Sequence, residues 1–73
     1  MTDVYWLSDV PDRDPWGSPI GDHFYDAPTR YHGWAILSEE SWKNHGSYHP
    51  QLGTGKGQRY DRQPDGRWKK TGG

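Results

Sequence analysis

The sequence predicts a small α+β fold, in which an antiparallel sheet of three or four strands carries one short helix and long irregular segments. The chain has 73 residues, which is enough for a single small domain spanning residues 1–73. Short runs of aromatic and branched residues alternate with clusters of glycine, proline and aspartate, as strands alternate with turns. One segment after residue 37 carries both the start and the stop signals of a helix.

The first strand is expected over about residues 4–7, because Val4-Tyr5-Trp6-Leu7 is rich in aromatic and branched side chains. Residues 8–30 are expected to form a long loop, since prolines, glycines and aspartates crowd this stretch. Long loops without secondary structure are uncommon in small domains and are often functional or disordered. The aromatic residues Trp16, Phe24 and Tyr25 can hold this loop against the rest of the protein.

A central strand is expected over about residues 31–37. Its second half, Trp34 to Leu37, has apolar side chains on both faces, which is typical of a buried strand.

A short helix is expected over about residues 39–45. Ser38 can cap its first turn, and Leu37 and Trp42 stand at the positions of a hydrophobic staple. Two glutamates occupy the first turn and Lys43 and a histidine the last, as the helix dipole favours. Gly46 is placed to end the helix.

A β-hairpin is expected over about residues 58–70, with its turn at Pro64-Asp65-Gly66. Gly66 can adopt the positive φ that a three-residue hairpin turn requires. This turn predicts a register in which three pairs of residues lie opposite each other: Arg62 and Trp68, Asp61 and Lys69, and Tyr60 and Lys70.

Aromatic residues dominate the apolar content. The sequence has five tryptophans, five tyrosines and one phenylalanine but few aliphatic residues, so a core must be built mainly from rings. Disordered chains usually combine few aromatics with a high net charge, whereas this chain has a formal net charge of −1. We therefore expect a folded core with loose segments around it.

Charge is divided unequally along the chain. Residues 1–37 carry six acids and two bases, whereas residues 53–73 carry two acids and six bases. Such asymmetry either steers a charged partner or lets the two ends of the chain attract each other.

The sequence lacks cysteine, which excludes disulfides and thiolate zinc sites and fits a reducing cytoplasm. The longest apolar run, Trp34 to Leu37, is far shorter than the roughly 20 residues of a membrane span. The N-terminus lacks the basic and apolar regions of a signal peptide. We therefore expect a soluble intracellular protein with no membrane partner.

The sequence patterns that would indicate metal binding or catalysis are weak. His23 lies beside Asp22 and near Asp26, and His45 and His49 have helical metal spacing, although a glycine between the last two interrupts the expected helix. Scattered surface histidines explain these patterns equally well. A small metal-dependent enzyme that uses His23 is therefore a third class of function, behind two kinds of binding protein.

The sequence gives no better support for nucleotide binding or for hydrolytic catalysis. Residues 52–57 superficially resemble a phosphate loop, but a glycine rather than serine or threonine follows Lys56, and a strand rather than a helix is expected next. No nucleophile elbow is present. We expect no catalytic residues, no metal and no cofactor, and hence no enzyme.

The basic hairpin is the strongest functional indication, because cations alternate with rings along it. Stacking rings beside cations are typical of nucleic-acid grooves, and Trp, Tyr and Arg are enriched in protein interfaces. Alternatively, both rings belong to the core and the long cationic side chains cover them. The predicted partner-binding residues are Arg59, Tyr60, Arg62, Arg67, Trp68, Lys69 and Lys70.

A resemblance to small phage proteins covers the whole chain. The residues that carry it run from Gly33 to Ser38, from Gly53 to Tyr60 and from Asp65 to Trp68. With its length and its cysteine-free, aromatic composition, the sequence resembles the small inhibitors of host RNA polymerase that lytic phages encode, as in a phage of Xanthomonas. No defined motif underlies this resemblance, so it assigns no contact residues.

The resemblance implies a regulator that binds bacterial RNA polymerase near the N-terminus of the β′ subunit. Such a protein would inhibit σ-dependent initiation and, as an antitermination factor, promote read-through of terminators. It would act as a monomer in the host bacterial cytoplasm, with nascent RNA or DNA nearby. The alternative that stays open is a stand-alone nucleic-acid-binding module that uses the basic hairpin.

Overall fold

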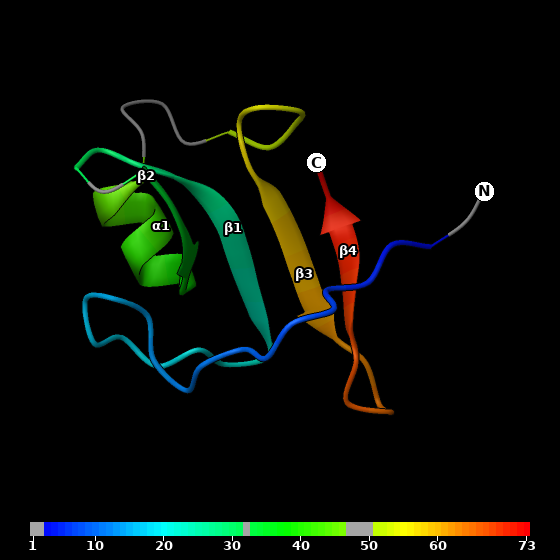
Figure 1. Ribbon diagram of the computed structural model, residues 1–73. Helices are drawn as coiled ribbons and strands as arrows, with labels where there is room; N and C mark the ends of the chain where they lie inside the picture. The colour runs from blue at the N-terminus through cyan, green and yellow to red at the C-terminus, as the bar shows by residue number, and fades with distance from the viewer. Residues whose placement is uncertain (1–2, 32, 47–50) are drawn as a thin grey trace.

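The computed structural model describes residues 3–31, 33–46 and 51–73. Four strands, β1 (His23–Thr29), β2 (Gly33–Leu37), β3 (Gln58–Arg62) and β4 (Trp68–Gly72), form one sheet in the order β2-β1-β3-β4. All three strand pairs are antiparallel. Helix α1 (Glu39–His45) packs against β1 and β2 (Figure 1). The predicted α+β fold, with a small antiparallel sheet and one short helix, is confirmed.

The loop prediction for residues 8–30 was wrong over its last third, where β1 lies. Phe24, Tyr25 and Ala27 are buried there, so this strand carries much of the core. Pro28 argued against a strand, because proline cannot donate to a sheet ladder. The sheet accommodates it because pairing with β3 extends only to Asp26, whereas pairing with β2 continues to Thr29.

The strand predicted over residues 31–37 begins at Gly33, and its central placement was wrong. Strand β2 lies at the edge of the sheet, while β1 and β3 occupy the centre. Tyr31 precedes the strand and is exposed, and 49% of Trp34 is exposed. The apolar run therefore has a covered face, on which Leu37 is buried, and a face that is partly exposed at Trp34.

The strand predicted over residues 4–7 was wrong in extent, because it amounts to one bridge between Tyr5 and Lys69. Two backbone hydrogen bonds flank this bridge: the Trp6 N–H donates to the carbonyl oxygen of Trp68 at 2.9 Å, and the Lys70 N–H donates to that of Val4 at 2.7 Å. The N-terminal segment therefore runs beside β4 and then across the sheet (Figure 1).

Helix α1 has the predicted bounds, Glu39–His45. The Ser38 hydroxyl accepts a hydrogen bond from the Ser41 N–H at 3.1 Å, which is the predicted N-cap. The Gly46 N–H donates to the Trp42 carbonyl at 3.1 Å, and Gly46 has extended rather than left-handed backbone angles. Among the described residues, no helix has the length and apolar character that crossing a membrane requires.

The hairpin turn and its three predicted residue pairs are confirmed, and β4 continues two residues further, to Gly72. Gly66 has φ 88°, and the turn is closed by the Gln63 N–H, which donates to the Arg67 carbonyl at 2.7 Å. A bulge between Arg59 and Tyr60 shifts the register.

Aromatic rings fill both faces of the sheet. On the back face, which α1 covers, the Trp42 ring stacks on Tyr25 with 4.0 Å between the ring centroids. On the front face, Phe24 is completely buried and contacts the rings of Trp6, Tyr60 and Trp68 at centroid distances of 5.3, 5.2 and 5.2 Å. The helix thus covers the back face of β1 and β2. The Trp6 ring covers part of the front face, where β1, β3 and β4 lie side by side.

Candidate functional site

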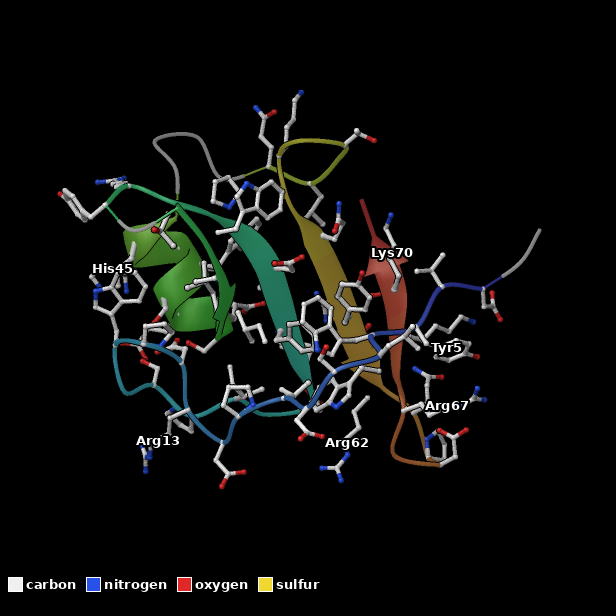
Figure 2. All side chains as sticks on the ribbon, viewed as in Figure 1. Tyr5, Arg13, His45, Arg62, Arg67 and Lys70 are labelled. Atoms are coloured by element: carbon white, nitrogen blue, oxygen red, sulfur yellow. The ribbon has the colours of Figure 1, made fainter. Side chains whose placement is uncertain are left out.

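The hairpin distributes its cations over both faces of the sheet. Side chains alternate between the two faces along a strand. Arg62 and Lys70 therefore lie on the front face, where Arg62 is opposite Trp68 and Lys70 is opposite Tyr60. Arg59 lies on the back face, where its guanidinium contacts Tyr25. Figure 2 shows Arg62 and Arg67 near the turn of the hairpin and Lys70 farther along β4.

The two rings of the hairpin belong to the core. Tyr60 is only 6% exposed, and its ring stacks on Phe24. Trp68 is half-buried, with its ring edge-on to Phe24. Tyr60 is therefore not available to a partner in this structure, because its ring already lies within the protein. Trp68 offers only part of its surface.

Three of the five predicted cations form ion pairs within the protein. The distances are 3.0 Å from Arg59 Nε to Asp61, 2.7 Å from Arg67 Nε to Asp65 and 3.6 Å from Lys69 Nζ to Asp3. The side chains of these pairs are about one-third to three-fifths exposed, and surface pairs of this kind contribute only about 0–1 kcal/mol each. A partner with acidic groups can therefore compete for these cations.

Arg62 and Lys70 differ from those three cations. Within residues 3–31, 33–46 and 51–73, no carboxylate forms an ion pair with either side chain. The Arg62 guanidinium carbon lies 5.9 Å from the centroid of the Trp68 ring, which is the range of a cation–π contact. These two side chains give the front face of the hairpin uncompensated positive charge.

A buried acid that the sequence interpretation missed fixes the loop before β1. Asp14 is 5% exposed. One of its carboxylate oxygens accepts hydrogen bonds from the Ser38 N–H at 3.0 Å and the Ser38 hydroxyl at 2.7 Å, and the other accepts from the N–H groups of Trp16 and Ser18 at 2.9 and 3.1 Å. Asp14 therefore ties the loop to the N-cap of α1.

The sequence did contain a signal for this arrangement. Asp14, Pro15 and Gly17 stand at the first, second and fourth positions of a β-turn, where these residue types are favoured. The Gly17 N–H donates to the Asp14 carbonyl at 2.9 Å, closing that turn. The turn was predictable, whereas the contact with Ser38, 24 residues away, was not.

Hydrogen bonds account for the ionisation of Asp14. Burial alone would raise the pKa of this carboxyl, but hydrogen bonds from the Ser41 and Ser38 side chains and from backbone N–H groups outweigh burial. The pKa of Asp14 consequently lies below its usual value.

His23 lies on the back face in a second polar cluster. Its Nδ1 is 2.8 Å from Asp22 Oδ1 and its Nε2 is 3.1 Å from Glu39 Oε1. The Tyr25 hydroxyl donates to the same Glu39 oxygen at 3.1 Å. Hydrogen bonds from His23, Tyr25 and Lys43 lower the pKa of Glu39 to about 2.

The suggested metal site does not assemble. Asp26 lies on the front face, opposite Ile36 and Gln58, whereas His23 lies on the back face beside Tyr25. His45 stacks on Trp16 with ring centroids 4.5 Å apart, and His49 lies outside the described residues. The part of the chain that the structure describes contains no group of three His, Asp or Glu side chains arranged to hold a metal ion, and no pocket.

These carboxylates predict how stability depends on pH. A carboxyl whose pKa is lower in the folded than in the unfolded protein stabilises the fold above its unfolded pKa, and this contribution disappears as the pH falls through the folded value. Glu39 should lose its contribution between pH 4.5 and about 2, and Asp14 should lose its contribution below 3.8. Asp26 acts oppositely, because burial raises the pKa of its carboxyl.

We therefore expect the urea midpoint of unfolding to fall as the pH is lowered from 6 toward 2, as measured by tryptophan fluorescence. The Glu39→Gln variant should show a shallower fall than the wild-type protein. A midpoint that rises steadily over this range would contradict the ionised hydrogen-bonding roles of Asp14 and Glu39.

Comparison with known proteins finds no match among family models, curated proteins or solved structures. The functional interpretation therefore depends on the surface of this chain and on the phage-protein resemblance of its sequence.

Proposed function

We propose that the protein is a phage-encoded regulator of bacterial transcription. It binds host RNA polymerase near the N-terminus of the β′ subunit, inhibits σ-dependent initiation and promotes read-through of terminators. The sequence resemblance supplies this target. The observation that supports a binding role is the uncompensated positive charge of Arg62 and Lys70 on an ordered hairpin.

The hairpin presents these charges in a fixed geometry. Residues 58–70 carry five cations and two carboxylates, a net charge of +3. Phe24 packs against the rings of Tyr60 and Trp68, and Trp6 packs against the rings of Phe24 and Tyr60, so that both strands are held. A preordered surface loses little conformational entropy on binding, and complementary charge accelerates encounter and fixes orientation.

A regulator of this kind acts by occupying a surface of its partner. The hairpin would face either an acidic surface of the polymerase or the nucleic acid near the RNA exit path. In this proposal the protein acts as a monomer in the host cytoplasm, and it needs no chemistry of its own.

Charge reversal tests this proposal. We expect the Arg62→Glu/Lys70→Glu variant to bind purified bacterial RNA polymerase about 100-fold more weakly than the wild-type protein, which corresponds to about 2.7 kcal/mol. Inhibition at a σ-dependent promoter and terminator read-through should be lost together. Binding is measured by biolayer interferometry, and both activities by single-round transcription.

The single variants Arg62→Glu and Lys70→Glu are measured as well, and Lys56→Glu is their matched control, because Lys56 is exposed and lies in the loop before β3, away from the hairpin turn. It should change the affinity by no more than about threefold, a difference well under 1 kcal/mol. Equal losses for Lys56→Glu and for the reversals of Arg62 and Lys70 would remove the hairpin from the interface.

A salt titration separates this proposal from a stand-alone nucleic-acid-binding module. Direct binding to nucleic acid weakens steeply as the salt concentration rises and needs no polymerase. Tight, salt-sensitive binding of the isolated protein to RNA or DNA, with no measurable affinity for polymerase alone, would support the module.

A further inference from the structure

The front face of the sheet is uncovered over part of β1 and β2. Pairing between these strands places Asp26 opposite Ile36 and Pro28 opposite Trp34, and residues paired in this way share one face. The ring contacts of Trp6 lie with Phe24 and Tyr60, farther toward β3 and β4, while α1 lies on the back face. Half of the Trp34 side chain is consequently exposed, at 49%.

An unpaired carboxylate stands at the centre of this area. Asp26 is half-buried between Ile36 on β2 and Gln58 on β3. Within the described part of the chain its side chain has no hydrogen-bond or ion-pair partner, and burial raises the pKa of its carboxyl. The other described carboxylates that are buried or half-buried, Asp14, Glu39 and Asp61, all have side-chain partners.

The unfavourable free energy of the unpaired Asp26 carboxylate indicates which kind of group would bind beside it. A partly desolvated carboxylate without a partner is unfavourable, and a cation placed beside it would recover that free energy. Lys70 lies on the same face, opposite Tyr60 on the far side of β3, and forms no ion pair with Asp26. Among residues 3–31, 33–46 and 51–73, no cation pairs with Asp26, which leaves the carboxylate open to a cation of a binding partner.

We propose that this surface, formed by Asp26, Pro28, Trp34 and Ile36, binds an arginine-bearing segment of a partner protein. The guanidinium would pair with the Asp26 carboxylate beside the Trp34 indole, and the apolar neighbours of the arginine would cover Pro28 and Ile36. Trp34 is the diagonal neighbour of Asp26 across the β1–β2 pair, a separation of about 7–8 Å that a guanidinium can bridge.

Arginine fits this surface better than lysine does. Its planar guanidinium can bond both carboxylate oxygens and lie on an indole face at once, whereas an ammonium is a strongly hydrated point charge. Phosphate groups of a nucleic acid would be repelled by Asp26. A second copy of this chain packed through a two-fold axis would bring the same patch against itself, and would set one Asp26 against the other.

The test uses two capped tripeptides, leucine-arginine-leucine and leucine-citrulline-leucine, which have the same length and shape but end the central side chain in a charged guanidinium and a neutral urea, respectively. They are titrated into isotopically labelled protein and followed by nuclear magnetic resonance. The arginine peptide should bind about fivefold more tightly, a factor in the range of one exposed cation–π or ion-pair contact. The indole N–H resonance of Trp34 should shift, while the backbone resonances of Arg62 and Lys70 should not.

Two variants assign the binding to the proposed residues. Asp26→Asn should remove the preference for arginine over citrulline, whereas Asp9→Asn, the same charge change at an exposed position, should retain it. Asp26→Asn should also unfold at a urea concentration no lower than wild type, because it removes a partly buried charge. Its loss of binding would therefore not be a loss of folding.

Four results would overturn the proposal: equal affinity for the two peptides, no shift of the Trp34 indole up to millimolar peptide, a shift of that indole with protein concentration alone, or the same shift caused by an oligonucleotide. The third result would indicate self-association and the fourth a nucleic-acid surface. None of them depends on RNA polymerase, so this proposal and the role of the hairpin can fail separately.

Discussion

Replacing Asp14 with alanine is expected to lower the free energy of unfolding by about 3 kcal/mol, because the substitution leaves four buried or partly buried donors without an acceptor. The donors are the backbone N–H groups of Trp16, Ser18 and Ser38 and the Ser38 hydroxyl. A domain of this size has a total stability of about 4–10 kcal/mol. The loss is measured from urea unfolding curves followed by tryptophan fluorescence.

The conservative Asp14→Asn variant should also lose stability, because its amide has one acceptor oxygen, so that either the two Ser38 donors or the N–H groups of Trp16 and Ser18 face a nitrogen that donates. Asp12→Ala is the matched control, since Asp12 is exposed in the same loop; its effect should stay within about 0.5 kcal/mol. If Asp14→Ala unfolded at the same urea concentration as Asp12→Ala, Asp14 would not be the anchor of the loop.

Features encoded by neighbouring residues were predictable from the sequence. Helix α1 was predicted with its observed bounds because Ser38 and Gly46, which delimit it, act on backbone groups within one turn. The hairpin register was predictable for a similar reason, since the turn at Gly66 sets which residues of β3 and β4 face each other.

Features that depend on distant residues were not predictable. Strand β1 was hidden among prolines and aspartates, and its pairing with β3 joins residues more than 30 positions apart, from Asp26 with Gln58 to His23 with Asp61. The anchoring of Asp14 by Ser38 also joins distant residues, which are 24 positions apart in the sequence. A local pattern cannot show which distant segment supplies the partner.

The candidate site was predictable in part. The sequence located the cationic hairpin but left open whether its rings are buried or exposed, because alternation gives the two faces of a strand without showing what covers them. Trp6 supplies that cover, since its ring meets Phe24 and Tyr60. Asp26 and Trp34 were not predicted as a surface, because neither strand had been placed beside the other.

The buried rings and the exposed cations of the hairpin depend on each other. Tyr60 and Trp68 face inward against Phe24, and the cations between them on β3 and β4 keep a fixed spacing only while this packing persists. A change in the core should therefore reduce polymerase binding even though the altered side chain is not accessible to a partner.

Phe24 gives the most direct test of this dependence. We expect Phe24→Ala to lower the free energy of unfolding by about 3–5 kcal/mol, the range for removing a buried phenylalanine and leaving a cavity. The side chain is completely buried and contacts Trp6, Tyr60 and Trp68. Urea unfolding gives the loss of stability, and amide hydrogen exchange shows whether β3 and β4 lose protection.

Two controls separate packing from hydrophobicity alone. Phe24→Leu keeps most of the volume and should cost about 1 kcal/mol, in the range of volume-conserving core substitutions. Leu7→Ala removes an apolar side chain that is 96% exposed and should change stability by less than about 0.5 kcal/mol. If Phe24→Ala kept the hydrogen-exchange protection of β3 and β4 while polymerase binding fell, Phe24 would affect binding by a route other than ordering the hairpin.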